Sequence, residues 1–143
     1  MLARSALISV ALLASLSQSA LAQRFNPPRN YMDSALVEMT ARAGIHYGQA
    51  YEQALHGQEA GLATLFQAGL HTDGAPAELH DSILWEMLQR WGDRRFAAVL
   101  RRQSREIRNR VRCSIDLGGC ADWTPKYPRT AAIAPSDPNC SCR

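Results

Sequence analysis

Long apolar runs are scarce in this chain, and lysine is nearly absent from it. The longest apolar stretch, residues 5–16, holds about 12 residues, whereas a helix needs roughly 20 to cross a bilayer. We therefore expect no permanent transmembrane anchor. Lys126 is the single lysine among 16 basic residues, so the positive charge of the chain resides almost wholly in arginine.

Several motifs of enzyme and metal chemistry are also missing. The chain has no HExxH zinc motif, no Gly-x-Ser-x-Gly nucleophile elbow and no phosphate-binding loop. No cysteine precedes Cys113, which argues against a lipoprotein anchored through an acylated cysteine, and the lone Arg4 argues against a twin-arginine signal. These absences favour a protein that is not an enzyme, and we expect no cofactor and no metal site.

The N-terminus has the order of features that is typical of a secretory signal peptide. Arg4 supplies a positive charge, the apolar run follows, and residues 20–22 are Ala-Leu-Ala, which suits a cleavage point. We expect residues 1–22 to be removed and the exported protein to begin at Gln23, in the bacterial periplasm or outside the cell. The alternative, a buried N-terminal helix, would normally carry polar residues on one face.

All cysteines lie in the last third of the chain. Their even number in an exported protein favours disulfides over thiolate metal ligands. The four are Cys113, Cys120, Cys140 and Cys142. A bond between the last two would close a very small ring, so we expect both to pair with the earlier two and to tie the tail to the last helix. A zinc or copper(I) site is the alternative, although the spacing matches no common zinc pattern.

Composition and spacing predict one small all-α domain of four to five helices. Residues 23–32 contain two adjacent prolines and are expected to form an extended lead-in, and residues 33–118 carry apolar side chains at helical spacing. Residues 119–143 are rich in proline and cysteine, which excludes a regular helix. We expect this tail to pack on the helical domain through Trp123 and Tyr127.

The boundaries of the first two helices follow from their end signals. Asp33 or Ser34 is a suitable cap for a first helix that runs to Gly57. A short second helix is expected over residues 59–68, and Gly69 is placed to end it in the left-handed conformation.

Later end signals divide the rest of the domain. A third helix is expected over residues 76–91 and stops at Gly92. Asp93 would cap a fourth helix, and the pair of glycines at 118–119 would end it. Ser104 is a suitable cap for a separate segment if the fourth helix breaks at that point.

The segment that starts at Ser104 also resembles a known repeat. Ser104, Ile107 and Val111, followed by Gly118, are similar to the second helix of HEAT-type repeats over about 15 residues. No second copy follows at a period near 40 residues. The resemblance implies that helical pairs of this domain stack as hairpins.

Charge is distributed very unevenly along the chain. Nine arginines between Arg90 and Arg112 face only two acidic residues, so this segment carries about +7 while the rest of the mature chain carries about −5. On a continuous helix, five of these arginines share a stripe about 60° wide. They are Arg94, Arg101, Arg105, Arg108 and Arg112.

This predicted ridge suits an anionic partner, because the planar guanidinium donates two parallel hydrogen bonds to a carboxylate or phosphate. An acidic protein, an anionic glycan and a lipid headgroup all fit. A merely solvated helix face explains the same charges. Nucleic acid is not expected, because the compartment is wrong and no aromatic platform accompanies the arginines.

Histidines are the remaining side chains with chemistry near neutral pH. His80 or His71 would form an acid–base pair if the fold placed it beside Asp73 or Glu59. None of the histidines lies in a spacing typical of a known catalytic or metal site.

These observations predict a small exported binding or inhibitor module of the immunity type, which meets a protein partner in the cell envelope. Two alternatives stay open. One is a small hydrolase that uses the His–carboxylate pair, and the other is a protein whose arginine ridge binds anionic glycan or lipid.

The cysteine and signal predictions can be checked together by mass spectrometry of the exported protein. We expect an N-terminus at Gln23, and four thiols that react with an alkylating reagent only after reduction. Thiols that react before reduction would favour the metal-site alternative instead.

Overall fold

The fold comes from a computed structural model, which describes residues 35–119 and 122–140. Helices and turns, with no strand, make up these residues, which confirms the predicted all-α class. The predicted signal peptide, the lead-in and the first helix cap lie outside the described residues, as do Cys120 and Cys142. None of the described helices is both long and apolar enough to span a membrane.

Two helices stand where the spacing predicts one. α1 spans Ala35–Arg42 and α2 spans Tyr47–Leu55, so the prediction of an unbroken first helix was wrong. Gly44 has φ +75°, its amide donates to the carbonyl of Ala41, and the next amide donates to the carbonyl of Thr40. This is the Schellman arrangement, in which a left-handed glycine ends a helix. Both halves keep the same apolar stripe, which is why periodicity alone hides the break.

The helix predicted over residues 59–68 begins and ends where it was predicted, but the glycine that follows it behaves differently. α3 spans Glu59–Ala68, and Gly69 has φ −59°, so it is not left-handed and instead starts a 3-10 turn, η2, over Gly69–His71. A Cβ on Gly69 would lie 3.0 Å from Nε2 of His80 and 3.3 Å from Cγ of Arg110. Close packing, rather than backbone conformation, therefore explains this glycine.

α4, which spans Gly74–Arg101, is the central helix of the fold. It contacts every other helix except α2 through several residues, and it fully buries Leu84, Met87, Leu88 and Phe96. Gly92 bends it, with φ +71° and ψ 158°, at the position where a stop was predicted. The predicted stop at Gly92 is therefore confirmed, and because the chain becomes helical again at once, the two predicted helices follow each other without a loop.

Asp93 follows this bend, and its carboxylate caps another helix rather than its own. Its two oxygens accept the backbone N–H groups of Arg129 and Thr130 at 2.9 and 2.8 Å. These amides lie in the first turn of α6, which spans Pro128–Ala131, and the first amides of any helix lack partners inside it. Asp93 thus joins α4 to the tail.

α5 spans Arg105–Gly119 and lies against α4. Oγ of Ser104 accepts the N–H of Ile107 at 3.2 Å, which confirms the predicted cap. The two glycines predicted to end this helix are part of it. Gly118 is needed because a Cβ there would overlap the carbonyl oxygen of Asp81 on α4, so the two helices approach to backbone contact.

The tail lies across α4 and α5. Trp123 and Tyr127 are 4% and 5% exposed, which confirms that they pack on the helices, and Tyr127 meets Trp85 edge to face with ring centroids 5.8 Å apart. The tail is more regular than predicted, because α6 and a 3-10 turn, η3 over Pro138–Cys140, both form within it.

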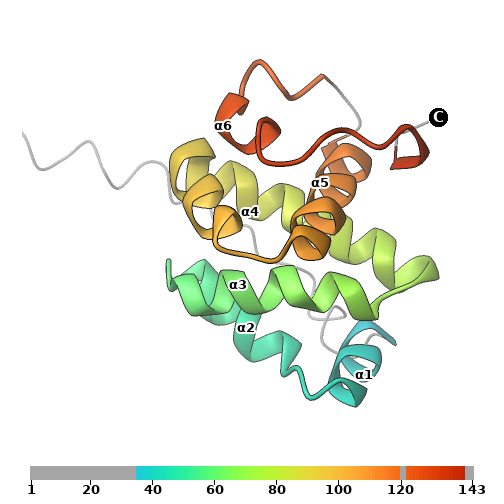
Figure 1. The fold of residues 1–143 in the computed structure, drawn as a ribbon. Helices are drawn as coiled ribbons and strands as arrows, with labels where there is room; N and C mark the ends of the chain where they lie inside the picture. The colour runs from blue at the N-terminus through green and yellow to red at the C-terminus, as the bar shows by residue number, and fades with distance from the viewer. Residues whose placement is uncertain (1–34, 120–121, 141–143) are drawn as a thin grey trace, which may run out of the picture.

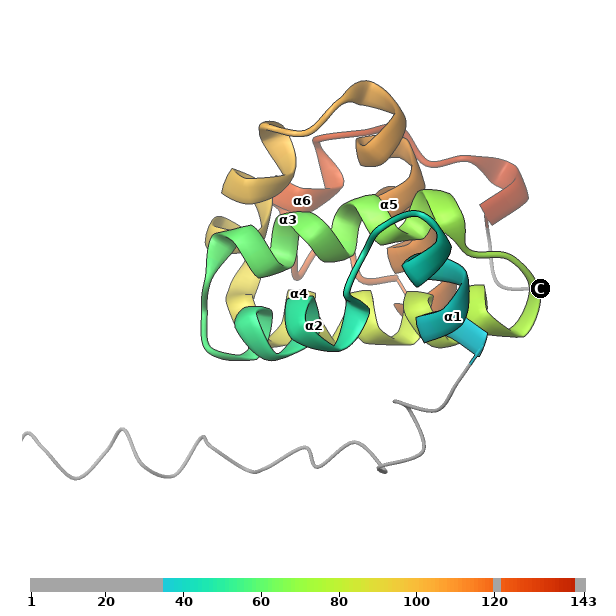
Figure 2. The ribbon, with the colours of Figure 1, turned by 90° about the horizontal axis from the view of Figure 1, so that it is seen from below.

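α4 separates two groups of elements. Figure 1 shows α1, α2 and α3 on one side of it and the tail with α6 on the other. α2 and α3 run side by side in both Figure 1 and Figure 2. The arginine-rich segment, residues 90–112, consists of the end of α4, the turn after it and the first half of α5.

The close approach of α4 and α5 predicts a large effect of one methyl group. Gly118→Ala should destabilise the protein by about 1–3 kcal/mol, because overpacking outweighs the gain in helix propensity of about 0.5–1 kcal/mol. Gly119→Ala is the matched control, since its Cβ would lie 3.2 Å from ring carbons of Trp85 and would therefore meet a side chain rather than the backbone of α4. Urea unfolding of the oxidised protein measures both, and equal stabilities of the two variants would contradict the packing argument.

Candidate functional site

The predicted arginine ridge is divided between two helices. Arg94 and Arg101 lie on α4 after its bend, whereas Arg105 and Arg108 lie on α5. Residues 102–104 form the turn between them. A single stripe requires a continuous helix, so the stripe geometry is wrong, and the two helical segments instead meet at a corner of the fold formed by this turn.

Four of the five predicted arginines lie on the two segments that meet at this corner and are at least partly exposed. Arg94, Arg101 and Arg105 are exposed, and Arg108 is half-buried. Within the described residues, the guanidinium groups of the first three form no hydrogen bond or ion pair. Nη1 of Arg108 donates to the carbonyl of Arg101 at 3.5 Å, which ties the two helices together at the turn. We call these four residues the arginine surface.

Two neighbouring arginines that were left out of the predicted ridge border this surface. Nη2 of Arg102 lies 2.5 Å from Oε2 of Glu59, and both side chains are more than half exposed. Arg95 lies over the ring of Trp91, 4.5 Å from its centroid, and donates to the carbonyl of Gly57. Both arginines therefore attach the corner to the α2–α3 loop and the start of α3. Both residues lie off the predicted stripe, so helical spacing gave no indication of these contacts.

Arg112 does not belong to the arginine surface, and its prediction as an exposed binding residue was wrong. It is 8% exposed, its Nε donates to both carboxylate oxygens of Asp116 at 3.0 and 3.1 Å, and its Nη1 donates to the carbonyl of Ala131 at 2.8 Å. Its guanidinium also lies 4.6 Å from the ring centroid of Trp123. The tail covers the face of α5 that the helical spacing assigned to solvent.

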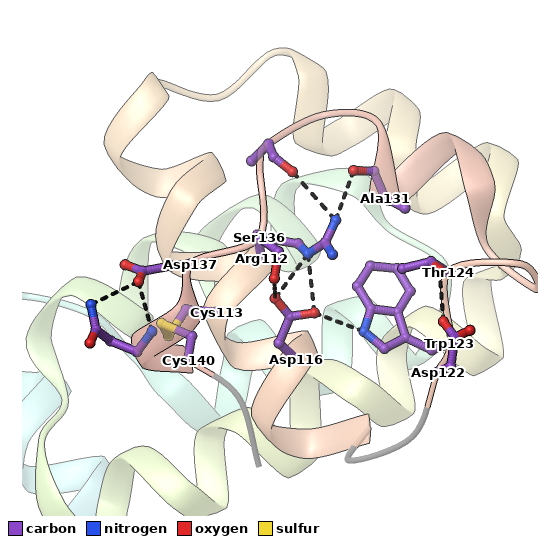
Figure 3. A network of polar contacts seen from close by, with 12 residues as sticks. Arg112, Cys113, Asp116, Asp122, Trp123, Thr124, Ala131, Ser136, Asp137 and Cys140 are labelled. Carbon is purple, nitrogen blue, oxygen red and sulfur yellow. Dashed lines mark hydrogen bonds and ion pairs between the residues drawn. A yellow bond between two sulfur atoms is a disulfide. The ribbon is translucent and has the colours of Figure 1, made fainter. Parts of the chain in front are cut away.

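Figure 3 shows the network that Arg112 shares with the tail. Asp116 also accepts a hydrogen bond from Nε1 of Trp123 at 2.9 Å and from Oγ of Ser136 at 3.2 Å. One carboxylate on α5 thereby holds residues from two parts of the tail. The network is structural, because every group in it is paired with another part of the same chain.

A disulfide lies beside this network. Cys113 on α5 is bonded to Cys140 in η3, which confirms the predicted link from the last helix to the tail for this pair. An open groove of about 470 Å³ runs along the bond. Its charged lining is already paired internally: Arg110 donates to Gly69, and Asp137 accepts two hydrogen bonds from Asn139.

The residues of the predicted His–carboxylate pair do not meet. His80 is wholly buried, and its Nδ1 is hydrogen-bonded to Oη of Tyr47 at 2.8 Å. Glu59 pairs with Arg102, and His71 and Asp73 are exposed near the turn between α3 and α4. No hydrogen bond or ion pair joins either histidine to either carboxylate, so nothing in this geometry favours the hydrolase alternative.

The part of the chain that the structure describes holds no group of three or more His, Cys, Asp or Glu side chains that would suit a metal ion. Comparison of the chain with protein-family models, with curated proteins and with solved structures gives no match. The arginine surface is therefore the candidate functional site, on the strength of its exposure and charge.

The buried and exposed arginines should respond differently to substitution. Arg112→Gln leaves Asp116 without its cationic partner, and we expect a loss of about 2–4 kcal/mol, as for a broken buried ion pair. Arg102→Gln removes an exposed pair and should cost less than about 1 kcal/mol. Urea unfolding of the disulfide-bonded protein compares the two. Similar losses would show that Arg112 does not hold the tail.

Proposed function

We propose that this chain is an exported, non-enzymatic binding module of the inhibitor or immunity type, and that its arginine surface contacts an acidic protein partner in the cell envelope. The signal-type order of residues 1–22 supports export. The Cys113–Cys140 disulfide supports it too, because such bonds persist mainly in oxidising compartments.

The exposure of the arginine surface is the observation that carries the binding proposal. Arg94, Arg101 and Arg105 keep their guanidinium groups in solvent with no internal acceptor among the described residues, although Arg110 and Arg112 show that this fold pairs its inward arginines. A guanidinium without an internal partner keeps all five donors available to a carboxylate of another molecule.

The rest of the described surface offers little else for recognition. Leu70 is the one large apolar side chain classed as exposed there, at 37%. Acidic side chains such as Glu38, Glu52 and Glu78 lie exposed on other elements. A domain with separated charges and few exposed apolar groups selects its partner by electrostatic complementarity, which acts on orientation and association rate.

An anionic glycan or lipid headgroup is the second candidate ligand, and the same observation favours it, because phosphate and carboxylate present similar acceptor geometry to arginine. The two candidates differ in a measurable way. A protein partner would be captured as a defined species, whereas a headgroup would bind in vesicles that contain no protein.

The test uses the triple variant Arg101→Gln, Arg105→Gln and Arg108→Gln. Immobilised protein is exposed to a detergent-solubilised native envelope fraction at moderate salt, and retained proteins are quantified. We expect the variant to lose the wild-type partner, with affinity lower by at least about tenfold.

The matched control carries Arg42→Gln, Arg90→Gln and Arg129→Gln, which remove the same charge from exposed side chains elsewhere. It should keep the partner. Retention of the partner by both triple variants would overturn the proposal. Binding of the wild type to vesicles of anionic phospholipid, with no protein retained, would replace the protein partner by a headgroup.

A further inference from the structure

A buried polar site that the proposed function does not use lies where α2, η2, α4 and α5 meet. His80 is 0% exposed, and its Nδ1 is bonded to Oη of Tyr47 while the two rings pack edge to face, with centroids 5.7 Å apart. Nε2 of His80 is buried and has no hydrogen-bond partner among the described residues. The imidazole therefore forms a buried polar link between α2 and α4 at this point.

Two acceptors close to this site are already engaged. Arg110 on α5 donates through Nε to the carbonyl of Gly69 at 2.9 Å and through Nη2 to Oδ1 of Asp81 at 3.3 Å. Asp81 follows His80 directly on the helix, where adjacent side chains point about 100° apart. Both oxygens therefore serve the guanidinium rather than the imidazole.

The charged and titratable groups around the His80 ring provide no acceptor for a second N–H proton on that ring. α2 contributes Tyr47 and, beside it, Tyr51; α4 contributes Asp81; α5 contributes the cationic Arg110; η2 contributes only backbone. An imidazolium has two N–H donors that both need acceptors. Here one has Tyr47, the other has none, and a guanidinium lies near.

We propose that His80 is an acid-sensitive lock, and that protonation of its buried ring opens the packing of α2 and η2 against α4 and α5. A buried charge that lacks an acceptor is strongly unfavourable, so the protonated ring must reach water. The outward movement breaks the Tyr47 contact. This role rests on the proposed export of the protein. An exported protein would meet the pH of the compartment outside the cytosol, so such a lock would respond to acidification of that compartment.

The direction of the pH effect follows from the buried site. Burial, and secondly the charge of Arg110, lower the pKa of His80 from 6.5 to about 3. The unfolded chain therefore binds this proton before the folded chain does, and stability is complete above pH 6.5 and is lost as the pH falls towards 3. Burial raises the pKa of Asp81 and of Glu86, so these two groups favour the folded state on acidification and act against the loss.

The test measures urea unfolding of the oxidised protein between pH 7.5 and pH 4. For the wild type, we expect the folding equilibrium constant to fall by up to tenfold per pH unit below pH 6.5. His80→Gln should flatten this dependence because its amide does not titrate. His46→Gln is the matched control, since that imidazole is exposed and forms no cap bond, and it should keep the wild-type profile.

Two measurements on the wild type keep the proposal testable even if His80→Gln fails to fold. NMR should show a neutral His80 ring in the folded protein at pH 5. Hydrogen exchange, corrected for its intrinsic pH dependence, should show α2 and η2 losing protection on acidification before α5 does. A His80 ring that becomes protonated near pH 6.5 with α2 still protected would overturn the lock, as would parallel pH profiles of His80→Gln and the wild type.

Discussion

The burial of α4 is the constraint on which the rest of the structure depends. α4 passes through the middle of a small domain, and its apolar side chains are covered by short elements on one side and by α5 with the tail on the other, while Arg90 and Arg101 stay exposed. The cover needs close fits: Gly118 admits backbone contact with α4, and Nε1 of Trp91 donates to the carbonyl of Ala54 at 3.0 Å across to α2. Polar groups that lie within these contacts, such as His80, are buried by the packing of the helices around them.

The arginines show how one residue type serves two purposes in a single segment. Arg110 and Arg112 turn inward, and each bonds a carboxylate and at least one backbone carbonyl together. A planar fork with five donors suits that task better than an ammonium group, which is consistent with the near absence of lysine. Arg101 and Arg105, a few residues earlier, stay in solvent. Composition therefore overstates the outward charge, and the structure reduces the candidate site to a small corner.

The sequence predicted well those features that depend on neighbours in the chain. The limits of α3, the cap at Ser104 and the burial of Trp123 and Tyr127 follow from local spacing and turn chemistry. Features that depend on distant contacts were missed. A helical wheel places Arg112 opposite the apolar face, but it does not show that the tail returns over that face. The break at Gly44 was missed because a glycine between two helices with one apolar stripe leaves the period unchanged, and Asp93 serves a helix 36 residues away.

Because Asp93 caps α6, the formation of α6 depends on the packing of the tail against α4. α6 has four residues, whereas an isolated helix needs roughly 12–15 to be even marginally stable in water. Its first amides are satisfied by a side chain of α4, and the carbonyl of its last residue, Ala131, accepts from Arg112 of α5. Its helical hydrogen bonds thus exist only while the tail rests on both helices. Secondary structure at this point is therefore a product of tertiary assembly.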